Sequence, residues 1–118
     1  MKRKLLFLVF TNDPCRRNHA FMYAVDLSRN GHDVRLIVEG DATRCLLERE
    51  GRFGELFEEA RGLGLLVGLC RAASQGCSDP SRDVTRLAEE CGLTLIDTLD
   101  GHAGIASFVA EGYEVITF

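Results

Sequence analysis

Cys70 is the residue of this chain best placed to do chemistry, because it directly follows the apolar run 64–69. Such a run predicts a buried strand whose end brings the thiol to the carboxyl edge of a parallel sheet, where open α/β folds hold their ligands. The charge of Arg71 and the backbone N–H groups of the next turn would favour the thiolate, which is the nucleophilic form. A reactive cysteine is one interpretation of this segment, and a thiol that only packs in the core is the other.

Polar side chains follow three other predicted strands in the same way. Asn12 comes after the run 5–10, Glu39 follows 34–38, and His102 lies in a polar segment after 93–96. Since the carboxyl ends of parallel strands meet at one edge, we expect these side chains to share a rim with Cys70. His19, in the first turns of the helix after the first strand, is expected to face that rim, where two histidines would tune the thiol pKa or move a proton. An ordinary surface position is the alternative for each histidine.

The other cysteines give little support for a metal centre or a disulfide framework. The chain has five, at positions 15, 45, 70, 77 and 91, and no pair has the two-residue separation of zinc and redox motifs. Cys45 and Cys91 fall on apolar faces of predicted helices, which indicates packing. Cys15 and His19 have a helical ligand spacing that would suit a metal shared with Cys70, but this spacing also arises by chance. We therefore expect reduced thiols, no bound metal and no cofactor.

The elements that must position these groups alternate between strand and helix along the chain. Apolar runs predict strands at 4–10, 33–39, 64–69, 93–96 and 113–117, and periodic segments predict helices at 14–30, 53–61, 79–91 and up to 110, with a short one that Asp41 caps. Right-handed crossovers between parallel strands give an α/β fold, a three-layer α/β/α sandwich around a five-stranded, mainly parallel sheet. We expect one domain over residues 1–118, with a strand order that the sequence leaves open.

Composition narrows the classes of partner. The net charge is −4 and the pI about 5.3, which argues against nucleic acid as a partner, because proteins that bind the phosphate backbone present a basic surface. The basic residues 2–4 and the apolar run 5–10 imitate a secretory signal, but the run stops at 11–14 without a small-residue cleavage site. No stretch approaches the ~20 apolar residues of a membrane span. We expect a cytoplasmic protein that binds neither nucleic acid nor membrane.

The segment 66–73, a strand followed by Cys-x-Ala-Ala, resembles the DsrE/DsrF-like family of sulfur-relay proteins. The likeness spans nearly the whole chain, because segments 10–14 with His19, 38–43, 101–102 and 111–118 are similar to a branch of small cytoplasmic members. The resemblance implies that Cys70 accepts sulfane sulfur as a persulfide and passes it to a partner thiol. It also implies donor and acceptor proteins as partners, and self-assembly as a trimer or hexamer. Exchange of this kind needs an accessible sulfur, and we expect Cys70 to be exposed.

One departure from the branch affects the mechanism. Many members have a second cysteine three positions after the first, where this chain has Ala73, so an intramolecular Cys-x-x-Cys relay is absent. Cys77 would replace it as a resolving thiol if the loop 74–76 folds back, and a loop cysteine without a role is the alternative.

A second interpretation uses the same rim without catalysis. Asn12, Glu39, Cys70 and His102 would hold a small anion, a nucleotide or a metal, because open α/β sheets bind ligands at this edge. The chain lacks the glycine-rich phosphate loop that would identify such a ligand.

Overall fold

A computed structural model of the chain describes residues 1–76 and 79–118 and shows five parallel strands in one sheet. The strands lie in the order β4-β3-β2-β1-β5, and every pairing is parallel. Their bounds are Lys4–Val9 for β1, Asp33–Val38 for β2, Leu66–Cys70 for β3, Leu95–Ile96 for β4 and Glu114–Thr117 for β5. The predicted α/β sandwich around a five-stranded parallel sheet is confirmed.

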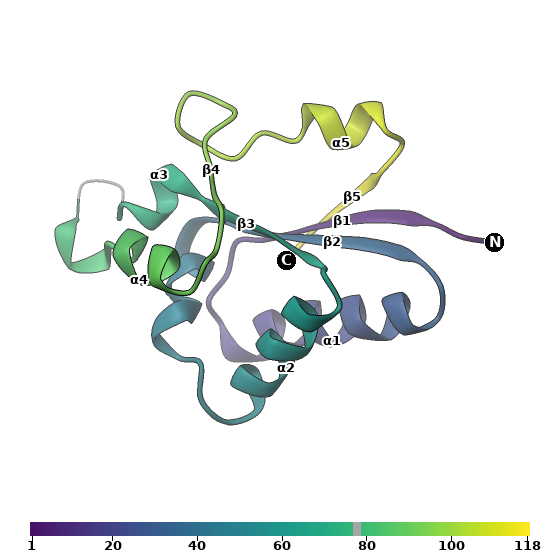
Figure 1. Cartoon of the computed structure of the whole chain (residues 1–118), viewed down its shortest axis with the longest axis horizontal. Coiled ribbons are helices and arrows are strands. Elements are labelled where there is room, and N and C mark those ends of the chain that lie inside the picture. The colour runs from purple at the N-terminus through teal and green to yellow at the C-terminus, as the bar shows by residue number, and fades with distance from the viewer. Residues whose placement is uncertain (77–78) are drawn as a thin grey trace.

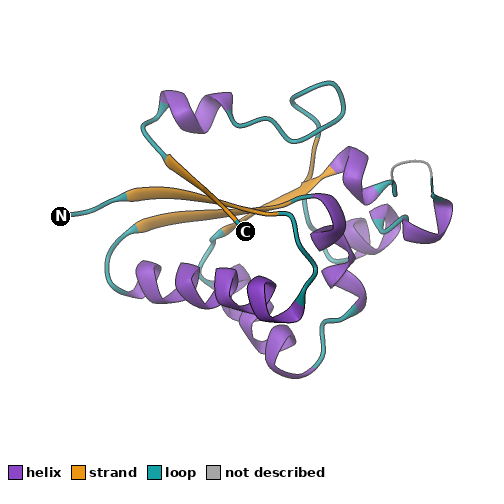
Figure 2. Ribbon diagram, turned by 180° about the vertical axis from the view of Figure 1, so that it is seen from behind, coloured by secondary structure: helices purple, strands orange, loops and turns teal. Residues whose placement is uncertain are grey.

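Helices cover the two faces of the sheet unequally. In Figures 1 and 2, α1 and α2 lie along one face, and the short α5 with the loop before it lies across the other. The helices are α1 (Pro14–Arg29), α2 (Gly51–Gly62), α3 (Arg71–Ser74), α4 (Thr85–Glu90) and α5 (Ala106–Ala110), with 3₁₀ helices η1 (Gly40–Leu47) and η2 (Pro80–Arg82). Among the described residues, no helix combines the length and apolar character that crossing a membrane requires.

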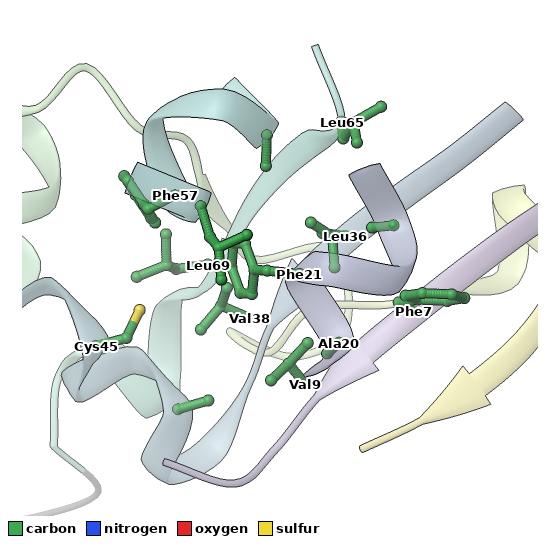
Figure 3. Packing of buried hydrophobic residues seen from close by; sticks show 14 of the residues in the cluster. Phe7, Val9, Ala20, Phe21, Leu36, Val38, Cys45, Phe57, Leu65 and Leu69 are labelled. Carbon is green, nitrogen blue, oxygen red and sulfur yellow. The ribbon is translucent and has the colours of Figure 1, made fainter. Parts of the chain in front are cut away.

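Alternation along the interior strand β1 divides the core in two. Phe7 and Val9 point toward α1 and α2, where Phe21 and Phe57 are fully buried against them (Figure 3). Leu6 and Leu8, one residue out of phase, belong to a smaller cluster on the opposite face. This is the period-two pattern of a strand buried on both sides. The elements on the second face are therefore held by the smaller of the two hydrophobic clusters.

Three local predictions differ from the structure. The helix predicted over 79–91 is two elements, η2 and α4, because Asp83 is extended (ψ 120°) and its carboxylate accepts the N–H of Thr85. Glu39, not Asp41, caps the short helix η1, and its carboxylate accepts the N–H of Gly40. The fourth strand is only Leu95–Ile96. In the first two cases a carboxylate, that of Asp83 or Glu39, accepts a backbone N–H at the beginning of the helix and so determines the residue at which α4 or η1 starts.

Candidate functional site

Cys70 is the last residue of β3, and α3 begins at the next residue. The β2–β3 register pairs Val38 with Leu69. Glu39, the residue directly after β2, therefore lies beside Cys70 on the neighbouring strand. On the other side Cys70 pairs with Ile96 of β4. The predicted position at the carboxyl edge of the sheet is confirmed. Its side chain belongs to the smaller cluster, on the face away from α1.

The prediction that Cys70 is exposed is wrong, because the residue is 0% accessible. The hairpin 98–104, which we call the covering hairpin, lies over it. Leu99 and His102 exchange two backbone hydrogen bonds across Asp100 and Gly101, whose φ angles of 47° and 84° make a tight left-handed turn. The Gly101 carbonyl accepts the N–H of Ala72, which fixes the hairpin to α3. The dipeptide Asp-Gly is typical of tight hairpin turns, and it is the sequence feature that predicts the covering hairpin.

Polar groups from three elements converge on the Cys70 sulfur. The backbone amides of Ala73 in α3 and Ala103 in the covering hairpin lower the pKa of the thiol, and the carboxylate of Glu39, directly after β2, raises it. Nδ1 of His102 lies 3.9 Å from Sγ. The amides stabilise negative charge on sulfur, and the carboxylate opposes it. This is a thiol with a built polar environment rather than one surrounded by aliphatic groups alone.

The balance of these contacts sets the ionisation of Cys70. Burial raises the pKa of its thiol, the Ala73 and Ala103 amides lower it, and Glu39 raises it again, with a net upward shift. Arg71, expected to favour the thiolate, instead pairs with Asp97 at 3.2 Å on the surface. The resting protein therefore holds Cys70 as a thiol at neutral pH.

Ser74 is a site residue that the sequence reading missed. It is fully buried, and its hydroxyl donates to the Cys70 carbonyl at 2.7 Å, while its own carbonyl accepts the N–H of Val84. These bonds fix the first turn of α3 and hence the direction of the Ala73 amide. A serine four residues after the key position is the available signal, since such hydroxyls bond back to the preceding turn.

His19 does not join this site. It lies on α1, which packs against the opposite face of the sheet, and its exposed ring contacts the Cys15 carbonyl at 2.6 Å. The Cys15 sulfur is 3.7 Å from the same nitrogen, so this pair is a local feature of one helix. Within residues 1–76 and 79–118, no group of three His, Cys, Asp or Glu side chains could hold a metal ion.

The remaining predicted rim residues have separate roles. Asn12 hydrogen-bonds Arg17 and Glu48, a cluster in which the Arg17 side chain is nearly buried and lies over the Phe53 ring. Cys77 lies outside the described residues. Of the predicted rim, the structure thus brings Glu39 and His102 to Cys70, and it places Asn12 elsewhere.

Cys45 shows what an inert cysteine looks like in this fold. It is buried among the aliphatic residues of the larger cluster (Figure 3), and burial raises the pKa of its thiol to about 12. The prediction that Cys45 is a packing residue agrees with this position.

Comparison with known proteins finds similarity over part of this chain. An uncharacterized protein of Archaeoglobus fulgidus is 40% identical over 43 residues, which make up 36% of this chain and 70% of the archaeal protein. No family model matches the chain, and no solved structure matches it. The relative's name gives no activity, so the site itself has to carry the functional argument.

Proposed function

We propose that this chain, which belongs to the family of that archaeal protein, carries sulfane sulfur as a persulfide on Cys70 and delivers it to a partner thiol. The observation that carries the proposal is the position of Cys70 at the carboxyl end of β3, where Nδ1 of His102 lies 3.9 Å from its sulfur and the backbone amides of Ala73 and Ala103 lower the pKa of its thiol. Two oriented N–H donors stabilise charge that develops on sulfur during exchange.

The exchange balances without an external oxidant. Cys70 loses its proton, and its sulfur attacks the outer sulfur of a donor persulfide. A new S–S bond forms at Cys70, the S–S bond of the donor breaks, and the departing donor thiolate takes up a proton. The same step in reverse, with an acceptor thiolate attacking the outer sulfur on Cys70, releases the cargo.

Access requires the covering hairpin to move, because Cys70 is sealed in the closed form. The hairpin carries both Ala103 and His102, so opening removes one amide and the imidazole together and leaves Ala73 and Glu39 in place. Among the described residues, the contacts that hold the covering hairpin include the Ala72–Gly101 hydrogen bond, the approach of His102 to Cys70 and the packing of Ala103. Short segments held by few contacts open at low free-energy cost.

The proposal includes a cytoplasmic setting, sulfur donor and acceptor proteins as partners, and a homo-oligomer, either trimer or hexamer. The odd number of cysteines and their irregular positions support a reducing compartment. The edge strand β5 exposes Val115 and Ile116, which supports contact with another copy. Light scattering that finds a strict monomer would contradict the assembly.

Mass spectrometry tests the central claim. The protein is incubated with a cysteine desulfurase and cysteine, or with glutathione persulfide, and peptides are mapped without reduction. We expect an added mass of one sulfur atom on the Cys70 peptide, and none at this position in Cys70→Ser. Cys45→Ser is the matched control and should keep the adduct. A wild-type protein without an adduct on Cys70 would refute the proposal.

One observation favours the second candidate, a module that binds a small anion. A hollow of about 70 Å³ borders Ala73 and is lined in part by Arg44, Arg82 and Asp41, and the last two form an ion pair at 3.1 Å. Nucleotide pockets are several times larger. Calorimetry with phosphate, on wild type and Arg44→Gln, tests this candidate, and binding that the variant loses would support it. A protein that takes sulfur on Cys70 and shows no heat with phosphate would exclude it.

A further inference from the structure

A groove of about 480 Å³ is lined by the covering hairpin and the beginning of α5. We call it the hairpin groove, and its lining residues are Thr98, Leu99, Gly104, Ile105, Ala106 and Ser107. Both elements that line it lie on the same side of the sheet (Figure 1). The groove therefore belongs to the layer that covers Cys70.

The apolar side chains at this groove are contiguous and largely unburied. Leu99 is 58% exposed, and Val109 on α5 is 54% exposed. Ile105 lies between them in the sequence and is half-buried, and its carbonyl accepts the N–H of Val109, which puts the two side chains on one face of the helix. A connected apolar surface of this kind marks an interaction site, whereas single exposed apolar residues do not.

Hydrogen bonds within the covering hairpin fix the shape of the groove. The N–H of Gly104 donates to the Thr98 hydroxyl oxygen at 2.9 Å, and Leu99 and His102 exchange two backbone hydrogen bonds. A Cβ atom at position 104 would lie only 2.8 Å from that oxygen, so the missing side chain of Gly104 lets the two sides of the hairpin meet. Leu99 is thus presented to solvent from an ordered turn, which limits the entropy that a partner must remove on binding.

The part of the chain that forms the groove carries acidic residues and no basic ones. Residues 87–118 include six Asp and Glu residues and neither Lys nor Arg. Asp100 at the tip of the covering hairpin and Glu111 directly after α5 are both exposed. Two other carboxylates of this segment pair with arginines of earlier segments, Asp97 with Arg71 and Glu114 with Arg3. The charge around the groove attracts a basic surface and repels an acidic one.

We propose that the hairpin groove is the docking site for a partner protein that inserts an apolar side chain flanked by lysine or arginine. An apolar anchor in a concave centre with charged residues at the rim is the usual arrangement of a protein interface. The partner is a protein whose cysteine exchanges sulfur with Cys70, and this assignment rests on the proposed sulfur-carrier function.

Docking in this groove also favours exposure of Cys70. Ile105 lines the groove and packs against the smaller hydrophobic cluster, which contains Cys70 and the buried Ala103. When the covering hairpin opens, Ala103 and the buried part of Ile105 become accessible next to the groove. A partner that covers this added apolar surface binds the open form more tightly, and a ligand shifts an equilibrium toward the form that it prefers.

Selection from random peptides displayed on phage tests the docking site, with the wild-type protein as target. We expect the enriched peptides to combine a large apolar residue with neighbouring Lys or Arg. Their affinity should fall about tenfold or more in Leu99→Asp. Leu47→Asp is the matched control, because Leu47 is 56% exposed and lines a different hollow, and it should keep the wild-type affinity. Asp100→Asn keeps a residue that tolerates the left-handed turn and should weaken binding about two- to fivefold.

Iodoacetamide labelling of Cys70, read from its peptide by mass spectrometry, tests the coupling. We expect a saturating amount of enriched peptide to speed this labelling several-fold in the wild-type protein and to leave it unchanged in Leu99→Asp. Equal labelling of the wild type with and without peptide would refute the coupling. Absence of enriched peptides, enrichment of acidic ones, or equal binding to Leu99→Asp would overturn the docking site. A wild-type dimer in analytical ultracentrifugation that Leu99→Asp dissociates would assign the groove to a second copy and would also overturn it.

The docking site and the sulfur-carrier function fail separately, because peptide binding needs no sulfur donor. Enriched peptides of the expected chemistry, together with a Cys70 that takes up no persulfide, would refute the sulfur-carrier function alone. Persulfide formation on Cys70 in a protein that enriches no such peptides would refute the docking site alone.

Discussion

Replacing Gly68 with alanine is expected to push β4 away from β3 and so to weaken the sheet beside Cys70. A Cβ atom at this position would lie 2.3 Å from the Thr94 carbonyl oxygen and 3.1 Å from its carbonyl carbon. Both are backbone atoms, which cannot rotate away as a flexible side chain would. The same oxygen accepts the N–H of Leu69 at 2.9 Å, so any shift of Thr94 also strains that hydrogen bond.

The expected loss follows from these two effects. Overpacking of a tight site costs about 1–3 kcal/mol, and a weakened backbone hydrogen bond costs about 1 kcal/mol more. Domains of this size unfold with roughly 5–15 kcal/mol, so a combined loss of about 2–4 kcal/mol is a large share. Since β4 has only two residues, little other pairing holds it in place. We expect the urea midpoint of Gly68→Ala to fall by on the order of 1 M.

Urea unfolding followed by circular dichroism measures this loss, and Gly62→Ala is the matched control. Gly62 is the last residue of α2, and a Cβ there would meet nothing within 4 Å. Alanine should therefore be neutral or stabilise by about 0.5 kcal/mol. A Gly68→Ala protein as stable as wild type would show that β4 does not approach β3 as closely as the structure has it.

Three further changes have defined outcomes. Tyr113→Phe removes the hydroxyl that donates to Asp33 at 2.7 Å, the main cause of that residue's lowered pKa. A carboxyl whose pKa is lower in the folded than in the unfolded protein stabilises the fold at pH values above its unfolded pKa, and this stabilisation is lost as the pH falls through its folded pKa. The variant should therefore lose about 1 kcal/mol of unfolding free energy at pH 7 and much less near pH 3, measured by urea unfolding. An equal loss at both pH values would contradict this. Glu48→Gln leaves the buried Arg17 charge without its counter-ion and should cost about 2 kcal/mol by the same assay, where a cost near zero would refute the argument. Cys45, with its pKa raised to about 12, should resist iodoacetamide at pH 8 until urea unfolds the protein, and rapid native labelling would show that it is not sealed.

Local patterns in the sequence determined the fold class and the place of the key thiol. The run 64–69 is apolar enough to be buried on both faces, which puts Cys70 at the end of a strand whatever the strand order. The same logic found Glu39 and His102 as strand-end and loop residues. Gly31 ends α1 after Arg29, within one residue of the prediction, because a left-handed glycine (φ 91°) closes the helix.

The tertiary structure decided which of these residues meet. The order β4-β3-β2-β1-β5 sets β2 directly against β3, so Glu39 reaches Cys70, whereas Asn12 follows β1, one strand farther away. His19 is lost to the site because α1 packs on the opposite face, a choice between layers that no local pattern encodes. Burial of Cys70 depends on the covering hairpin, which comes from a segment some 30 residues later in the chain. Contacts at such separations depend on the packing of the whole chain, and a single sequence read segment by segment does not contain them.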